Sequence, residues 1–384
     1  MKIGIISMYY KSENYGGNLQ AYALTKIING FGNEFDASQI SYNYKPMKRS
    51  LVFRIKSRLH HLYYLCIRNP KIRKQTKIRS KKILEFNKNM ISHDSVIYNR
   101  KNIFRASDKY DLFITGSDQV WNPRWYDVAY RLDFVSDMPK MSYAASVGVK
   151  ALSDEQSAVF KKTLSDYFAV SVREENAVGL LQPVSPVKVE WTLDPTMLLS
   201  DEQWNEICTE RKIKEKYLFC YFLGDDISQR RLAEQYASEY SLKLVTLPHV
   251  FGEFRRCDKN FGDYPLYDVS PADFISLIKH ADYIFTDSFH ASVFSLIYKK
   301  EFFVFHRDGQ ISMGSRVDSL TSLFGVQDHF CDTNKKKTLE YIKSLQPVDY
   351  SKNFPIFEAM KKSSLDFLKS NLHRAKEMLK QNEY

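Results

Sequence analysis

Short apolar runs alternate with amphipathic stretches along most of this chain, and such alternation is typical of strands that are each followed by a helix. In the first half, the apolar runs predict strands at residues 2–7, 111–115, 141–145, 168–172 and 188–193. Apolar residues repeat at helical spacing over residues 18–30 and 154–165, and this periodicity predicts two amphipathic helices. Strands and helices in alternation favour a parallel sheet with helices on both faces.

The same alternation begins again near Tyr217. It predicts strands at 217–223, 243–247, 283–286 and 302–305, and helices at 228–240, 271–280 and 289–299. A polar, charged stretch at 199–216 separates the two halves. Two such blocks predict an α/β protein with two domains. We place the first domain at 1–205, the second at 206–345, and a final helix at 346–384 that crosses back to the first domain.

Length and composition agree with this picture. A chain of 384 residues is long for one core, and 44% apolar with 26% charged residues is typical of a globular protein. No stretch approaches the 18 or so consecutive apolar residues of a membrane-spanning helix. The start of the chain turns polar too early for a secretory signal. The five cysteines are scattered, without the spacing of a disulfide framework or a zinc site. We therefore expect a cytoplasmic protein that needs no metal.

The net charge of +11 has a local origin. Residues 48–82 carry 13 Lys and Arg residues and no acidic residue, so the rest of the chain, at 11 − 13, has a charge of −2. We predict a basic helical insertion at about 48–90. Three interpretations stay open: a solvated helical face, an amphipathic hairpin on an anionic membrane, and a nucleic-acid site. No nucleic-acid-binding motif supports the third, and we predict no such partner.

The most informative segment is 283–294, where an apolar strand ends in polar residues and continues directly into an apolar helix. Ligands of open α/β sheets bind beyond the carboxyl ends of the strands. His290 would lie there in the first turn of the helix, near unpaired backbone N–H groups and the positive end of the helix dipole. This position suits an anion and a group that transfers protons. The alternative is structural: Asp287 or Ser288 caps the helix, and His290 is an ordinary buried residue.

Three more loops follow predicted strands. The glycines in 14–18 allow a close approach of the backbone to a ligand, although the segment is not a nucleotide-binding fingerprint. The segment 116–123 combines Asp, Gln, Asn and Trp, which suit hydrogen bonding and stacking with a sugar. Arg173, in 171–174, offers a fork for phosphate or carboxylate, and Arg316 adds a second cation. Each loop also has a plainer explanation, as a tight turn, a turn around a buried Trp, or a surface ion pair.

Six segments, in this order, resemble the polysaccharide pyruvyl transferase family. They are NYGGNLQAYAL (14–24), TGSDQVWN (115–122), YAASVG (143–148), SVRE (171–174), DPTMLL (194–199) and TDSFHA (286–291). Each motif is modest by itself, but six in the family's order exceed chance similarity. The resemblance runs from the first strand to about Leu323.

This resemblance implies a GT-B-like fold, in which two Rossmann-like domains enclose an active site between them. It implies the transfer of pyruvate from phosphoenolpyruvate to a sugar of a polysaccharide precursor, as a cyclic ketal on two hydroxyls. The family's His and Arg correspond to His290 and Arg173. Ser288 stands where some members have Arg, and Ala291 stands where Gly is usual. One anion contact is thereby in question, and Arg316 is the candidate substitute.

Residues and resemblance together give one hypothesis for the site. Catalysis is assigned to Asp118 and to His290, which acts as an acid/base group or as an anion anchor. The donor, phosphoenolpyruvate, is assigned to Arg173, Ser288, His290 and Arg316. The acceptor sugar is assigned to a set of residues of the first domain: Asn14, Gly17, Gln119, Trp121 and Asn122. No cofactor is expected beyond phosphoenolpyruvate as a substrate.

A carrier-linked acceptor would give the basic segment a purpose. Polysaccharide repeat units are assembled on polyprenyl diphosphate at the inner membrane face, so residues 48–82 would make a peripheral contact with anionic lipid. Two other functions stay open. One is a nucleotide-sugar glycosyltransferase on the same scaffold, since fold does not fix reaction. The other is a non-catalytic carbohydrate-binding member of the fold.

Overall fold

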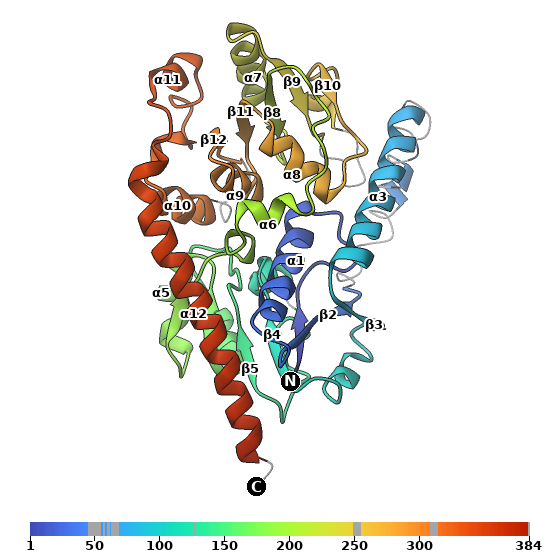
Figure 1. Cartoon of the computed structure of the whole chain (residues 1–384), viewed down its shortest axis with the longest axis vertical. Helices are drawn as coiled ribbons and strands as arrows, with labels where there is room; N and C mark the ends of the chain where they lie inside the picture. The colour runs from blue at the N-terminus through green and yellow to red at the C-terminus, as the bar shows by residue number, and fades with distance from the viewer. Residues whose placement is uncertain are drawn as a thin grey trace.

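The computed structural model describes residues 1–44, 55–56, 58–59, 62, 69–125, 127–248, 255–307 and 314–382. These residues form two lobes, each built on a parallel sheet with helices packed against it, and a long C-terminal helix runs along both (Figure 1). The predicted α/β class with two Rossmann-like domains is confirmed.

The first lobe contains a seven-stranded sheet of order β3-β2-β1-β4-β5-β6-β7. Its strands are β1 Lys2–Ile6, β2 Asp36–Tyr42, β3 His93–Tyr98, β4 Leu112–Thr115, β5 Lys140–Ser142, β6 Tyr167–Val172 and β7 Val189–Trp191. Its helices are α1 Tyr15–Gly30, α3 Pro70–Met90, α4 Asp154–Leu164 and α5 Glu175–Leu181. Short 3-10 helices lie at Ile103–Ala106, Gln119–Trp121, Pro123–Trp125, Gln182–Val184 and Pro195–Met197.

The second lobe contains a six-stranded sheet of order β10-β9-β8-β11-β12-β13. Its strands are β8 Tyr217–Tyr221, β9 Lys243–Thr246, β10 Tyr264–Pro265, β11 Tyr283–Thr286, β12 Glu301–Phe305 and β13 Phe330–Cys331. Its helices are α7 Ile227–Glu239, α8 Pro271–Lys279, α9 Phe289–Ile297, α10 Gly314–Leu323 and α11 Leu339–Ser344, with 3-10 turns at Arg256–Asp258 and Gln327–His329. The short helix α6, Asp201–Asn205, lies between the two sheets in sequence. The domain division at 205/206 stays a prediction.

The last helix, α12 Tyr350–Asn382, crosses from the second lobe back to the first (Figure 1). Near its start, Phe357 packs on Phe324 with ring centroids 4.9 Å apart. Further along, the hydroxyl of Ser364 accepts the backbone N–H of Leu193 at 3.0 Å. The predicted crossing helix is thus confirmed.

Both sheets reverse their strand order beside their first strand, between β1 and β4 and between β8 and β11. Such a switch point leaves a crevice at the carboxyl ends of the strands. The two crevices meet because α1 packs against the second lobe. Tyr15, in the first turn of α1, stacks on Phe274 with centroids 5.0 Å apart, and its hydroxyl donates to the carbonyl oxygen of Val269 at 2.9 Å.

Two strands of the first sheet, β2 and β3, are absent from the sequence-based prediction. In β2, polar residues interrupt the apolar pattern, yet Gln39 and Ser41 are buried because they find partners. The hydroxyl of Ser7 donates to Gln39 Oε1 at 2.8 Å, and Ser41 donates to the carbonyl oxygen of Asp94 at 2.8 Å. Buried polar groups that are paired are tolerated inside a sheet, so hydropathy alone does not reveal such a strand.

Candidate active site

His290 lies at the contact between the lobes. It is the second residue of α9, it is 7% exposed, and its ring lies against the first turn of α1. A Cβ atom at Gly16 would come within 1.9 Å of its Nδ1 atom, so only glycine leaves room for the imidazole. The imidazole therefore lies where the carboxyl ends of the two sheets meet.

Asp194 connects His290 to Arg173. It lies just beyond β7 and is 1% exposed. Its Oδ2 atom accepts hydrogen bonds from Arg173 Nη1 at 2.8 Å and Ser117 Oγ at 3.0 Å, and it lies 3.6 Å from His290 Nε2. Its Oδ1 atom accepts from the backbone N–H of Thr196 at 3.0 Å. Burial raises the pKa of Asp194, but His290 and Arg173 outweigh burial and hold that pKa well below its usual value.

Arg173 follows β6 and carries unused donors. Its guanidinium lies 4.6 Å from the ring centroid of Phe289, and it lies 3.8 Å from Asp118 and 3.9 Å from Glu174. Nε and Nη2 are buried without a hydrogen-bond partner among the described residues. Burial lowers the pKa of Arg173, but the nearby carboxylates of Asp194, Glu174 and Asp118 raise it by more. The net pKa lies above its usual value, so the group stays charged. A buried guanidinium with two free donors is suited to an oxyanion.

Arg316, in α10, approaches the same aromatic ring. Its guanidinium carbon lies 6.0 Å from the centroid of Phe289. When the side-chain amide oxygen of Gln119 faces it, that oxygen accepts from the two terminal nitrogens of Arg316 at 3.0 and 2.8 Å. Burial, and then repulsion from Arg173, lower the pKa of Arg316 to about 10. Two arginines that repel each other favour an anion between them.

Asp118 has an unusual backbone. Its φ and ψ angles are 71° and −175°, a conformation that is nearly restricted to glycine and costs other residues about 1–3 kcal/mol. Its carbonyl oxygen accepts from the backbone N–H groups of Val120 at 2.7 Å and Ser146 at 3.0 Å, which holds the turn. Its Oδ2 atom lies 3.4 Å from the position of a Cβ atom at Gly17. The strained turn thus brings the carboxylate to the first turn of α1.

Three of the residues that the sequence analysis assigns to the acceptor make contacts within the protein. Asn14 caps α1, because its Oδ1 atom accepts from the backbone N–H of Gly17 at 3.3 Å. The Oδ1 atom of Asn122 accepts from the backbone N–H of Arg124 at 3.0 Å. Trp121 is 3% exposed and packs in the core, edge-on to two aromatic rings. The contacts with Phe160 and Tyr167 leave little of the Trp121 ring exposed for stacking on a sugar.

The turn before α9 also differs from the alternative in which Asp287 or Ser288 caps the helix. Asp287 does not cap this helix, because its carboxylate accepts from the backbone N–H groups of Leu223 at 2.6 Å and Gly224 at 2.7 Å. It therefore ties β11 to β8 across the switch point. Ser288 is the N-cap residue, but its side chain makes no capping hydrogen bond. The helix thus begins at the crevice without a capping side chain.

We call the group His290, Arg173, Arg316, Asp118, Glu174 and Asp194 the interlobe cluster. Three carboxylates in it accompany the basic groups that the sequence assigns to the anionic donor. The sequence analysis assigns no role to Asp194 or Glu174. Each nevertheless lies in a family motif at the carboxyl end of a strand, and this position is the sequence feature that points to the site. Glu174 is buried and accepts from the hydroxyl of Ser146 and from the backbone N–H of Val147 at 3.3 Å.

Metal ligands are a separate question. Within the described ranges, no group of three or more His, Cys, Asp or Glu side chains is arranged to hold a metal ion. No helix in those ranges is long and apolar enough to cross a membrane.

Comparison with known proteins identifies the family. The sequence model of the polysaccharide pyruvyl transferases matches residues 14–309. The chain belongs to this family. No curated protein matches the sequence significantly.

Solved structures with a similar fold share little sequence. The UDP-GlcNAc 2-epimerase from Methanocaldococcus jannaschii aligns over 97% of this chain and 100% of its own, with a TM-score of 0.56 and 11% identity. S. aureus MnaA, solved with UDP, aligns over 94% and 90%, with a TM-score of 0.55 and 12% identity. The glycosyltransferase SnogD from Streptomyces nogalater aligns over 98% and 99%, with a TM-score of 0.51 and 10% identity. At such identities the likeness concerns the fold, and it agrees with the GT-B-like architecture.

Proposed function

We propose that this protein transfers pyruvate from phosphoenolpyruvate to a sugar of a polysaccharide precursor and forms a cyclic ketal. The observation that carries the proposal is the interlobe cluster, in a chain of the pyruvyl transferase family. Phosphoenolpyruvate has a phosphate and a carboxylate. Arg173 has two unused donors beside Arg316, and paired guanidinium groups bind such oxyanions well.

The reaction needs one group that moves protons. A proton added to C3 of phosphoenolpyruvate leaves an oxocarbenium-like centre at C2. One sugar hydroxyl attacks C2 and loses its proton, the C2–O bond to phosphate breaks, and the second hydroxyl closes the ring with loss of its proton. We assign the proton transfers to His290, whose Nε2 atom is buried 3.6 Å from Asp194. Asp194 would orient the imidazole, as the third group of a catalytic triad orients the base. In this assignment Asp118 orients an acceptor hydroxyl.

Access to the cluster requires movement. His290 belongs to the second lobe and Arg173 to the first, and both are nearly enclosed. We propose that the lobes separate by a hinge motion to admit the donor and then close on it, as two-domain enzymes with an interdomain site do. Closure would exclude water from the oxocarbenium-like centre.

The direct test is binding and turnover of phosphoenolpyruvate. Calorimetry should detect phosphoenolpyruvate binding that Arg173→Met abolishes, and an acceptor should make the enzyme release phosphate. The polysaccharide of a strain without the protein should lose a pyruvate-sized mass. If phosphoenolpyruvate neither binds nor releases phosphate with the strain's own polysaccharide precursors, the proposal is wrong.

A nucleotide-sugar reaction is the second candidate. It is favoured by the structural neighbours, one of which is solved with UDP and another of which is a UDP-GlcNAc epimerase. Calorimetry with UDP-GlcNAc distinguishes the two, because this donor should bind only if the second candidate is correct. Binding of sugar with neither donor would indicate a non-catalytic member.

We also propose that α3 contacts an anionic membrane. Lys71, Lys74 and Lys77 are exposed on this helix, together with Ile78 and Leu84. Clustered Lys side chains are attracted to anionic lipid by about 1 kcal/mol each. Arg79 is excluded from this surface because it is buried at the lobe interface, with its guanidinium 4.8 Å from the ring centroid of Tyr15. Much of residues 48–68 lies outside the described residues.

Vesicle co-sedimentation tests this contact. Binding to phosphatidylglycerol vesicles should exceed binding to phosphatidylcholine vesicles, and Gln at the three exposed lysines should reduce it. A matched control makes the same change at three exposed lysines of α12: Lys352, Lys362 and Lys369. Equal binding by both triple variants would exclude α3 as the membrane contact.

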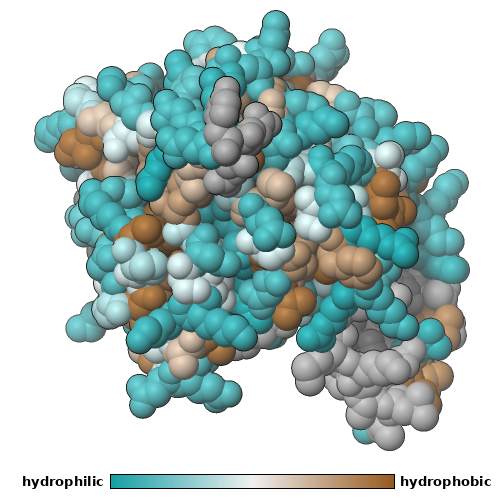
Figure 2. All heavy atoms as spheres, turned by 90° about the horizontal axis from the view of Figure 1, so that it is seen from below, coloured by the Kyte–Doolittle hydropathy of each residue, from teal (hydrophilic) through white to brown (hydrophobic). Residues whose placement is uncertain are grey.

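The visible face in Figure 2 shows hydrophobic residues scattered among hydrophilic ones, as on an ordinary protein surface.

A further inference from the structure

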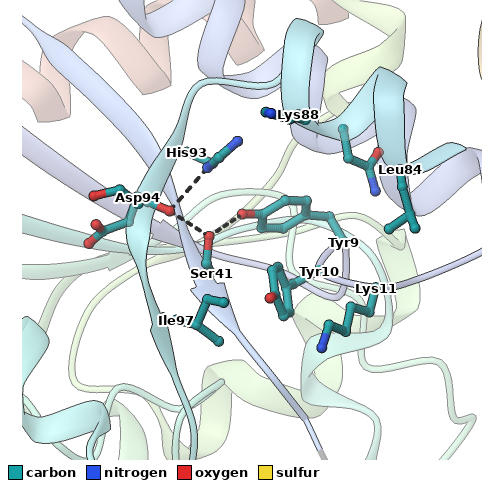
Figure 3. A pocket seen from close by; sticks show the side chains of 11 residues that line it. Tyr9, Tyr10, Lys11, Ser41, Leu84, Lys88, His93, Asp94 and Ile97 are labelled. Carbon is teal, nitrogen blue, oxygen red and sulfur yellow. Dashed lines mark hydrogen bonds between the residues drawn. The ribbon is translucent and has the colours of Figure 1, made fainter. Parts of the chain in front are cut away.

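A cavity of about 340 Å³ lies in the first lobe and shares no lining residue with the interlobe cluster (Figure 3). Its walls come from the turn after β1, from β2 and β3, and from α3. The size is within the range of small-molecule sites. We call it the first-lobe cavity.

One polar group in its wall has no partner. Asn87, on α3, is 7% exposed, and neither its Nδ2 nor its Oδ1 atom has a hydrogen-bond partner among the described residues. An unmade hydrogen bond of a buried amide costs about 1–3 kcal/mol. This side chain is therefore best explained by a ligand that both donates and accepts at the same place.

Four other polar residues in the wall are already paired. The hydroxyl of Tyr9 donates to Ser41, which donates to the carbonyl oxygen of Asp94, and Nδ1 of His93 lies 3.0 Å from that same oxygen (Figure 3). These bonds fix the floor of the cavity. What remains for a ligand is the amide of Asn87, a largely apolar wall, and the polar ends of four lining residues, Tyr10, Lys11, Lys88 and Ser95.

An aromatic ring borders the opening. Tyr10 is half-buried, and the ammonium group of Lys11 lies 5.4 Å from its ring centroid. Lys11 has a φ angle of 55°, and the backbone N–H of Ser12 donates to the carbonyl oxygen of Tyr9 at 3.0 Å, so a strained tight turn holds the ring in place. Strain of this kind is concentrated at functional sites.

The same loop leads to the interlobe cluster. Asn14, which caps α1, is three positions after Lys11, and Gly16, which touches His290, is five positions after it. Five extended residues span at most about 18 Å. A ligand in the first-lobe cavity is therefore close enough to be part of one extended substrate.

We propose that the first-lobe cavity is a carbohydrate subsite that binds a sugar residue of the acceptor beside the one that receives the ketal; this identification rests on the proposed function. A pyranose carries adjacent donors and acceptors for Asn87 and an apolar ring face for Tyr10. An acetamido sugar fits best, because its amide N–H and C=O match the Asn87 amide. A hydrocarbon chain would leave that amide unpaired, which argues against a lipid.

Saturation-transfer NMR on the full chain tests the proposal, with N-acetylglucosamine, N-acetylmannosamine, glucose, galactose and octyl alcohol as separate probes. At least one sugar should receive saturation, and Asn87→Leu should weaken its binding about tenfold, as expected for a lost hydrogen-bonded pair. The control is Asn89→Leu, the same change on the exposed side of α3, which should bind like the wild type. No sugar signal, or equal signals in both variants, would overturn the proposal. Saturation of octyl alcohol alone would show an apolar site instead.

Turnover separates this proposal from the proposed function. If phosphate is released from phosphoenolpyruvate and Asn87→Leu leaves the acceptor KM unchanged, the pyruvyl transfer stands and the subsite is wrong. If a sugar binds through Asn87 but no phosphate is released, the subsite stands and pyruvyl transfer is wrong.

Discussion

The interlobe cluster and the first-lobe cavity differ in how far their buried polar groups find partners within the protein. In the cluster, charged side chains from both lobes neutralise one another, and Asp194 makes hydrogen bonds with both of its oxygens. In the cavity, one lobe supplies every lining residue, and the buried amide of Asn87 has no hydrogen-bond partner in the described part of the chain. The carboxylate of Asp194 is thus satisfied in the folded state, although Nε and Nη2 of Arg173 have no hydrogen-bond partner among the described residues. In the cavity, by contrast, both polar atoms of the Asn87 side chain lack one. The comparison predicts that polar-to-apolar substitutions have opposite effects on stability at the two places.

The largest effect is expected at His290. His290→Ala should lower turnover by about 10²–10⁴-fold, the usual contribution of an acid/base group. Phosphate release from phosphoenolpyruvate with acceptor measures it. His373→Ala is the control and should keep normal turnover, because His373 lies on α12 beside Glu34 and Phe35 and belongs to no part of the cluster. Near-normal turnover of His290→Ala would remove this residue from the mechanism.

The next effect concerns the buried pair Arg173–Asp194. Arg173→Met leaves the carboxylate buried without its ion-pair partner, and the free energy of unfolding should fall by about 3–5 kcal/mol. Adding Asp194→Leu should recover much of this loss, because both charges are then gone. Urea unfolding of the two variants measures the difference. Equal stability of Arg173→Met and the wild type would mean that the pair does not hold the cluster together.

A smaller effect is expected from a single methyl group at the lobe contact. In Gly16→Ala the new Cβ atom would overlap the ring of His290, so the imidazole must shift, and a shift of about 1 Å can cost 10²-fold in turnover. Gly30→Ala, at the end of the same helix, has open space around its Cβ position and should be active. If both variants are equally active, the close packing of Gly16 on His290 does not matter for catalysis.

Acid should weaken the cluster in a way that depends on Asp194. Its folded-state pKa lies below the unfolded value of about 3.9, so its stabilisation is complete above that value and is lost as the pH falls through the folded-state pKa. Asp194→Asn should therefore be less stable than the wild type at pH 7, with the difference shrinking in strong acid. Thermal unfolding measured from pH 7 down to about pH 1 tests this, and a difference that grew toward low pH would contradict it.

The smallest effect, and the one of opposite sign, is expected in the first-lobe cavity. Asn87→Leu removes an unpaired buried amide without removing a hydrogen bond, so the unliganded protein should gain up to about 1 kcal/mol in the free energy of unfolding. Urea unfolding measures it beside Asn89→Leu. A clear loss of stability in Asn87→Leu would show that the amide has a structural partner and that the contrast between the two regions is wrong.

Much of the architecture was predictable because buried parallel strands and their helices have strong apolar patterns. The helix predicted at 271–280 is α8, which ends one residue earlier at Lys279, and the strand predicted at 283–286 is β11 with the same bounds. The exceptions have local causes. The helix α1 begins three residues before the predicted range 18–30 because Asn14 caps it. The apolar pattern does not predict β2, because this strand contains buried polar residues that are paired.

The sequence by itself determined the α/β class, the two blocks of strands and helices, and the loops that carry the family's motifs, because these depend on local periodicity and residue type. Tertiary structure alone decided which motif residues meet. The contact of His290 with Gly16, the burial of Trp121, and the partners of Asp194 all join segments that are far apart in the chain. Such contacts depend on how the two sheets face each other, and no local pattern encodes that arrangement.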